Sequence, residues 1–285
     1  MKPNHKYSIL PFNQCALCGI NSDLKLSHII PSYFGKSIKG KCQTIVDALN
    51  PEKTPKPQDI TKVYLLCGEC EGKINKWETL FRNRIMPKNK SILAPVIYGE
   101  WMLRFAVSIS WRVLTYLKYS KLHLTDHISN KEFEKFVPAI ESDSHKEAEK
   151  ALNVWKDFLM GNRNDVGIFK QHIIVLNGEN FPHEYSNAVG FTIFQKNGIL
   201  TTHALMKHFI ILGFIQESSS LEWEGTEIDP IRGELGKQQK IPELYFNWLA
   251  DMFQEIENSS LTEWQSRKNQ KDMIRAFKSG NGFYR

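Results

Sequence analysis

Two C-x-x-C pairs, Cys15–Cys18 and Cys67–Cys70, flank the segment Leu24-Lys25-Leu26-Ser27-His28-Ile29-Ile30-Pro31. Each pair lets two thiolates converge from one chain turn, and Gly19 after the first pair permits the tight backbone turn that this requires. Zinc prefers four tetrahedral ligands, which two such pairs provide. We therefore expect a structural zinc ion held by Cys15, Cys18, Cys67 and Cys70.

The residues between and after the pairs predict two short strands and a helix. Leu24–Ile30 alternates and then turns apolar, as a short strand does, and Pro31 ends it. Lys62–Leu66 predicts a second strand, and Glu71–Arg84 predicts a helix with one apolar face. The 48 residues between the pairs exceed the usual zinc-finger spacing, and an insertion over 32–61, dense in Lys and Pro, accounts for the excess as a loop.

The rest of the chain alternates between helical and strand-like patterns. Helices are expected over Tyr98–Lys121, Lys131–Gly161, Pro242–Glu257 and Leu261–Lys278, and a loop over Glu217–Lys240. Strands are expected over Gly167–Leu176, Ala188–Gln195, Ile199–His203 and His208–Gln216, with Asn197-Gly198 as a hairpin turn. The fold class predicted is α+β, with a zinc-braced finger over 1–90, a helical region over 91–161 and a mixed strand and helix region over 162–285.

Composition indicates a protein that buries a core and works inside a cell. Hydrophobic residues make up 41% of the 285, and charged residues 24%. No positively charged start runs into an apolar stretch, so we expect no secretory signal. The most apolar helical segment carries Arg104 and Arg112, which are too costly for a lipid-facing span. Five cysteines, four of them in C-x-x-C pairs, are typical of metal binding in a reducing compartment, with Cys42 left as a spare thiol. We expect a soluble, cytoplasmic protein.

Positive charge is concentrated in the part of the chain that holds the cysteines. Residues 1–90 carry 15 Lys and Arg against 7 Asp and Glu, a net +8, whereas the remaining residues sum to −2. This asymmetry favours a polyanionic partner such as nucleic acid, the alternative being a merely solvated lysine-rich surface. The candidate phosphate contacts are Lys36, Lys39, Lys41, Arg82 and Arg84, with the nearby aromatics Tyr33 and Phe34 as candidates for stacking on bases.

The cysteine pairs, the Leu26-Ser27-His28-Ile29-Ile30-Pro31 segment and the helix after Cys70 together resemble the HNH (His-Me finger) endonucleases. The resemblance covers roughly Cys15–Arg84, under a third of the chain. It implies a ββα unit braced by zinc knuckles. It also implies a histidine at the end of the first strand that activates water, and a divalent cation at the start of the helix that receives the scissile phosphate.

Carried over by position, the resemblance makes His28 the candidate general base, since an imidazole titrates near neutral pH. Three positions depart from the family pattern. Ser27 stands where an acid or histidine binds the metal, Glu71 where histidine or asparagine is frequent, and Lys62 where asparagine is usual. Glu71 is still a candidate ligand for Mg²⁺ or Mn²⁺, the alternative being an acidic first-turn residue favoured by the helix dipole.

A polar stripe at spacing four, Arg104, Ser108 and Arg112, interrupts the otherwise apolar helix over Tyr98–Lys121. Buried arginines need partners, so the stripe either meets carboxylates or lines a groove for phosphate. Glu78 is a candidate carboxylate partner, and such a pair ties the finger to the helical core.

The resemblance to HNH endonucleases implies a metal-dependent endonuclease that hydrolyses DNA, with RNA as a second possible substrate. Two alternatives remain open. The finger has lost its chemistry and binds nucleic acid or protein, or it belongs to a nuclease subunit that a partner protein activates. Fingers with large unassigned extensions are similar to effectors of bacterial anti-phage defence, so a role of that kind is a further hypothesis.

Overall fold

The computed structural model describes residues 14–37, 45–46, 61–86, 96–124, 144–176, 189–217, 222–236 and 238–252. The chain divides into two units, with the boundary between Ile241 and Pro242. In the second unit, residues 243–252 are helical, as expected for the start of the helix over Pro242–Glu257. The helix expected over Leu261–Lys278 lies outside the described residues, as do 131–143. The fold is mixed α+β, with a cluster of four cysteines near the N-terminus.

Strands β1 (Leu24–His28) and β3 (Lys62–Cys67) pair antiparallel, and helix α2 (Gly68–Arg84) follows β3 directly. Cys67 caps the helix, because its Sγ atom accepts the backbone N–H of Cys70 at 3.5 Å. The apolar face of α2 is buried at Ile74 and Phe81, which are 2% and 0% exposed. The two strands and the helix expected from the sequence are therefore confirmed.

The segment over 32–61, expected as a loop, contains a short helix and a strand. Helix α1 (Ser32–Ser37) and strand β2 (Ile45–Val46) lie in it. The sequence expectation was wrong here because Phe34 supplies a core contact that the Lys and Pro content conceals. Its side chain is fully buried, and its ring centroid lies 5.9 Å from that of Phe81.

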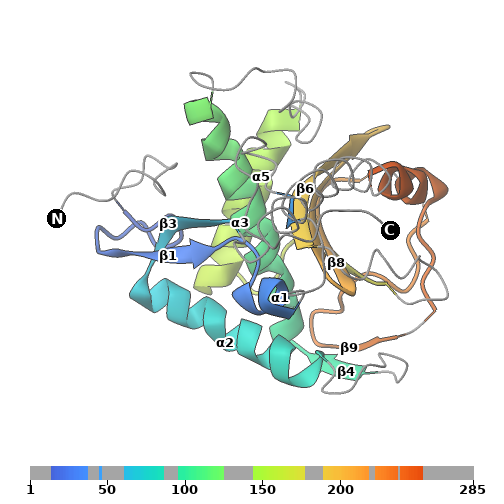
Figure 1. Ribbon diagram of the computed structural model, residues 1–285, viewed down its shortest axis with the longest axis horizontal. Coiled ribbons are helices and arrows are strands. Elements are labelled where there is room, and N and C mark those ends of the chain that lie inside the picture. Colours follow the sequence, from blue (N-terminus) through green and yellow to red (C-terminus); the bar gives the residue numbers. More distant parts are fainter. Residues whose placement is uncertain are drawn as a thin grey trace, which may run out of the picture. The chain divides into compact units, whose positions relative to one another are not determined.

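Helix α3 (Trp101–Leu124) lies between the β1, β3 and α2 group and a five-stranded sheet (Figure 1). Helix α5 (His145–Met160) packs beside it. Most side chains of α3 are buried because α2, α5 and the sheet cover different sides of it. Among the described residues, no helix combines the length and apolar character needed to cross a membrane.

The five-stranded sheet contains β2 and four longer strands: β5 (Gln171–Val175), β6 (Val189–Lys196), β7 (Ile199–Met206) and β8 (Phe209–Gln216). The strands lie in the order β2-β6-β7-β8-β5. All neighbours are antiparallel except β2 and β6. The expected hairpin turn is confirmed, since Asn197 and Gly198 both adopt positive φ, 51° and 76°. The sheet meets α3 through a 2.7 Å hydrogen bond from Ser110 to Gln171.

A second small sheet pairs β4 (Val96–Gly99) with β9 (Arg232–Leu235). Both strands escaped the sequence prediction, and β9 lies in the Glu217–Lys240 segment that was expected to be a loop. Their pairing is short and distant in sequence, so no local periodicity indicates it. The Tyr98 side chain covers Gly233, where an added Cβ would lie 2.1 Å from the phenolic oxygen.

Candidate functional site

Cys15, Cys18, Cys67 and Cys70 converge on one point. Their Sγ atoms all lie within 4.8 Å of one another, and the pair Cys18 and Cys67 is 3.8 Å apart. Thiolates at about 2.3 Å from a tetrahedral zinc ion are about 3.8 Å from one another, so the spacing fits that ion. All four are free thiols rather than disulfides.

The electrostatics of this cysteine cluster favour a cation. Burial, together with the neighbouring Cys15 and Cys67 sulfurs, raises the pKa of the Cys70 thiol well above its usual range. Four thiolates so close together repel one another unless a positive charge compensates them. A bound metal ion supplies that charge, which makes the cluster compatible with structural zinc.

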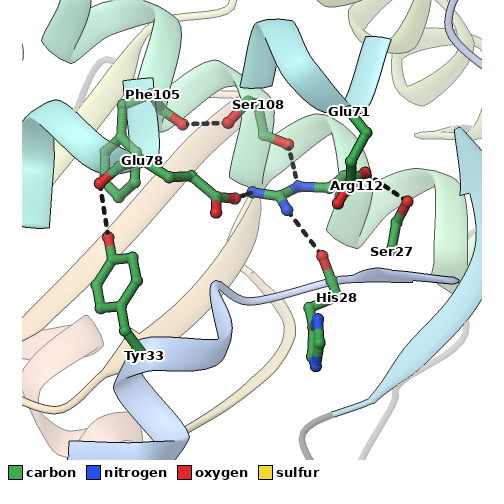
Figure 2. Close-up of polar contacts among 8 residues, drawn as sticks. All are labelled: Ser27, His28, Tyr33, Glu71, Glu78, Phe105, Ser108 and Arg112. Atoms are coloured by element: carbon green, nitrogen blue, oxygen red, sulfur yellow. Dashed lines mark hydrogen bonds and ion pairs between the residues drawn. The ribbon is translucent and has the colours of Figure 1, made fainter. Parts of the chain in front are cut away.

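At the other end of β1, Ser27 meets the first turn of α2. Its hydroxyl donates a 2.6 Å hydrogen bond to the Oε2 atom of Glu71 (Figure 2). Ser27 is fully buried and faces the helix, as does its strand partner Val63. The hydroxyl and the carboxylate are both oxygen donors, so together with water they are chemically suited to Mg²⁺ or Mn²⁺.

His28 lies on the opposite face of β1, because successive residues of a strand point to opposite sides. Its imidazole points away from Glu71 and Ser27 in Figure 2. Lys62 is directly opposite His28 in the register of β1 and β3, so both side chains occupy the same half-exposed face. The structure therefore brings Ser27, rather than His28, against Glu71, and sets Lys62 beside His28.

The surroundings of His28 favour a neutral ring. Burial lowers the pKa of the imidazole, and the positive charges of Lys62, Arg112 and Lys36 lower it further, while Glu71 acts in the opposite direction. A histidine with a depressed pKa is uncharged at neutral pH, so one of its ring nitrogens can accept a proton from water. This is the protonation state that a general base needs.

The predicted partnership of the arginine stripe with Glu78 is confirmed at Arg112. The Arg112 guanidinium forms a 2.8 Å ion pair with Glu78 of α2, and Arg112 is only 2% exposed. Arg104, two turns of the stripe earlier, instead donates to the carbonyl of Phe158 at 3.0 Å and lies over the Phe158 ring. Ser108 donates to the carbonyl of Phe105.

The candidate phosphate contacts occupy separate places. Lys36 is exposed on α1, and Arg82 and Arg84 are exposed in the last turn of α2. Lys39 and Lys41 lie outside the described residues. The stacking role considered for Phe34 is wrong, because its ring is fully buried against Phe81 and Tyr33.

Two relationships escaped the sequence analysis. The first is the position of Lys62 directly opposite His28 in the paired strands. The sequence analysis noted Lys62 only because it stands where the HNH pattern has an asparagine. The contact between Arg112 and the main-chain carbonyl of His28 spans 84 residues, and no sequence signal indicates a bond to a backbone atom.

Comparison of the chain with protein-family models, curated proteins and solved structures gives no match. The resemblance to HNH endonucleases therefore rests on the residues and spacings of this chain.

Proposed function

We propose that the N-terminal region is a divergent zinc-braced ββα finger of the HNH kind that hydrolyses phosphodiester bonds of DNA, with His28 as the general base. The observation that carries the proposal is the pairing of His28 with Lys62 on the half-exposed face of β1 and β3. A base beside a positive charge suits a reaction in which water attacks an anionic phosphate.

Each residue of the proposed site has a separate role in hydrolysis. Lys62, with Lys36 nearby, attracts the phosphate. Burial, with the positive charges of Lys62, Arg112 and Lys36, lowers the pKa of the His28 imidazole and so favours its neutral form. His28 takes a proton from water as the water oxygen bonds to phosphorus and the bond to the leaving oxygen breaks. The exposed Lys36, Arg82 and Arg84 hold the backbone of the nucleic acid, which makes binding salt-dependent.

Glu71, with the Ser27 hydroxyl, would hold a divalent cation, and water would complete its ligand set. When bound, such a cation would stabilise negative charge on a phosphate oxygen. It would lie across β1 from the His28 imidazole, so the attack by water in this proposal rests on His28 and Lys62. The cysteine cluster serves a different purpose, because it joins the turn before β1 to the junction of β3 and α2.

A second candidate function is a finger that binds nucleic acid without cutting it. The observation that favours it is the bond between Ser27 and Glu71, in which the two candidate ligands already satisfy each other. In that case substitution of Glu71 leaves the function intact.

The experiment compares cleavage and retention of single- and double-stranded DNA and RNA by the wild type, His28→Ala and Glu71→Gln, with Mg²⁺ or Mn²⁺ present. His145→Ala is the matched control, since His145 is exposed at the start of α5. The proposal predicts cutting by the wild type and the control, and loss of cutting but not of binding in His28→Ala. Binding without cutting by all four proteins would establish the second candidate instead.

A further inference from the structure

The Arg112 side chain joins three elements of the fold through its guanidinium group. Its Nε atom donates to the carbonyl of Ser108, one turn earlier in α3, at 3.0 Å. One terminal nitrogen donates to the main-chain carbonyl of His28 at 2.7 Å, and the other pairs with Glu78 at 2.8 Å (Figure 2). An arginine is suited to this task because its planar fork presents several donors in fixed directions.

The peptide unit that follows His28 is therefore held from both sides. Its carbonyl oxygen accepts from Arg112, and its N–H, which belongs to Ile29, donates to the carbonyl of Thr61 at 3.0 Å. Fixing this peptide plane fixes the backbone at His28 and hence the direction in which the imidazole leaves the strand. The Arg112 side chain is itself packed in the protein interior, since it is 2% exposed in the middle of α3.

Glu78 is the counter-ion of Arg112. Its negative charge balances the buried guanidinium while Arg112 donates to the carbonyl of His28. Glu78 has 15% of its side chain exposed, and its carboxylate faces the Arg112 guanidinium. The same turn of α2 is braced from α1, since the Tyr33 hydroxyl donates to the carbonyl of Glu78 at 3.4 Å. The ion pair leaves one guanidinium nitrogen for His28.

We propose that Arg112 is a positioning residue for His28, which sets the direction of the candidate base by holding its main-chain carbonyl from α3. The expected effect of Arg112 on catalysis rests on the proposed function. The claim that Arg112 sets the direction of the His28 imidazole does not depend on that function. Arg112 is 2% exposed, so we place its effect on catalysis through His28 rather than through contact with substrate.

Arg112→Lys tests the role because a single ammonium keeps the charge but cannot reproduce the fork. We expect the introduced ammonium to retain the pairing with Glu78 and to lose the carbonyl of His28. Arg104→Lys is the matched control: the same substitution in the same helix, at a residue that contacts Phe158 and not β1. Zinc content and helical signal check that both variants are folded.

The first readout is the imidazole signal of His28 in NMR spectra, assigned by comparison with His28→Gln. The charged groups around His28 are Lys36 on α1, Lys62 on β3, Glu71 on α2 and Arg112 on α3, and Arg112→Lys conserves the charge of all four. We therefore expect the His28 signal to move or broaden in Arg112→Lys and to stay unchanged in Arg104→Lys. Equal spectra for the two variants would overturn the proposal, whether or not the wild type cleaves nucleic acid.

The second readout is kinetic. A misdirected base lowers the turnover number and leaves substrate binding alone, so kcat should fall about 10- to 100-fold in Arg112→Lys with KM unchanged. A change in KM alone would contradict positioning. If the wild type does not cut, the proposed function fails while the NMR comparison still decides the role of Arg112.

If Arg112→Lys loses its zinc or helical signal, the double variant Glu78→Gln/Arg112→Gln replaces it. This variant removes both charges together and so avoids a lone buried ion. The comparison is made at a pH where the imidazole is neutral in both proteins, because this variant also removes the Arg112 charge that lowers the pKa of His28. There, a displaced His28 signal in the folded double variant supports the positioning role, and an unchanged signal refutes it.

Discussion

Ser27 donates a hydrogen bond to Glu71 across 2.6 Å, from the face of β1 that is covered by the first turn of α2. The resemblance to HNH endonucleases implies a metal ligand at each of these two positions. Here the neutral hydroxyl of Ser27 stands in place of the first ligand and donates a hydrogen bond directly to Glu71, the second. The contact is thus both the best candidate for a divalent-cation site and the clearest departure from the family pattern.

Ser27→Asp should strengthen binding of a divalent cation at this contact. Two carboxylates at hydrogen-bond distance repel each other, and Mn²⁺ or Mg²⁺ relieves the repulsion as hard oxygen donors surround it. Titration calorimetry with Mn²⁺ should give a dissociation constant at least about tenfold lower than for the wild type, equivalent to about 1.4 kcal/mol. Ser27→Asn, similar in size but uncharged, is the control. Equal affinities for the two variants would show that Glu71 does not face a cation site.

Cys15→Ser and Cys67→Ser should each abolish stoichiometric zinc binding. The wild type should carry about one zinc ion per chain, and structural zinc sites contribute about 10–16 kcal/mol of apparent binding free energy in small fingers. Acidification should release the ion, because protons compete with zinc for the thiolates. Elemental analysis of the purified proteins measures the content, with Cys42→Ser as the control that keeps its zinc. Full zinc content in both cysteine variants would exclude the four-cysteine site.

The Arg112 and Glu78 pair should respond asymmetrically to removal of either partner. Glu78→Leu leaves a guanidinium that cannot lose its proton, so we expect a loss of about 3–5 kcal/mol of unfolding free energy. Arg112→Met should cost less, because burial already raises the pKa of Glu78 and the carboxyl group can take a proton.

The pH dependence of the Arg112→Met variant follows from the same shift. A carboxyl group whose folded pKa is raised adds stability below its unfolded pKa, near 4.5, and loses it as the pH rises through the folded value. As the pH falls from 7 to 5, the unfolding free energy of Arg112→Met should therefore rise relative to that of Glu78→Leu. Chemical denaturation at the two pH values measures this, and an equal difference at both would contradict the account.

Two buried histidines should make the protein sensitive to acid. Burial lowers the pKa of His172 to about 3, with Lys170 adding to the effect, and lowers that of His203 to about 3 as well. The stability that each contributes is complete above the unfolded pKa, about 6.5, and is lost as the pH falls toward 3.

Between pH 6 and pH 4 each histidine should cost about 1.4 kcal/mol of unfolding free energy per pH unit. His172→Gln, which keeps a polar group for the hydroxyl of Thr226, should reduce the slope by that amount. Denaturation curves at several pH values give the slope for variant and wild type. Parallel slopes would show that His172 is not held neutral in the folded protein.

Local sequence patterns predicted the elements that they encode and failed for those that depend on distant contacts. The spacing of the cysteines, the turn at Asn197-Gly198 and the buried partner of Arg112 all follow from local chemistry or from the need to compensate a buried charge. Strand β4 pairs with β9 across more than a hundred residues, and β2 joins β6 from within a segment that composition marks as a loop. These pairings depend on contacts between segments far apart in the sequence, so no local pattern predicts them.

The candidate site shows the same division. The sequence indicated His28 and Glu71 but left their relative placement open, because the face of a strand residue depends on register. Only the pairing of β1 with β3 sets Lys62 beside His28, and only the position of α3 brings Arg112 to its carbonyl.

The most direct test of the account is the pH dependence of the cleavage rate for labelled DNA under single-turnover conditions. A neutral His28 acting as base predicts a rate that rises with pH and reaches half its maximum below pH 6.5, the ordinary pKa of histidine. Lys62→Ala should move that midpoint upward, because removal of a neighbouring positive charge raises the pKa of the imidazole, whereas Lys25→Ala, exposed on the same strand pair, should not. An unchanged midpoint in Lys62→Ala, or the same pH profile in His28→Ala as in the wild type, would contradict the central claim.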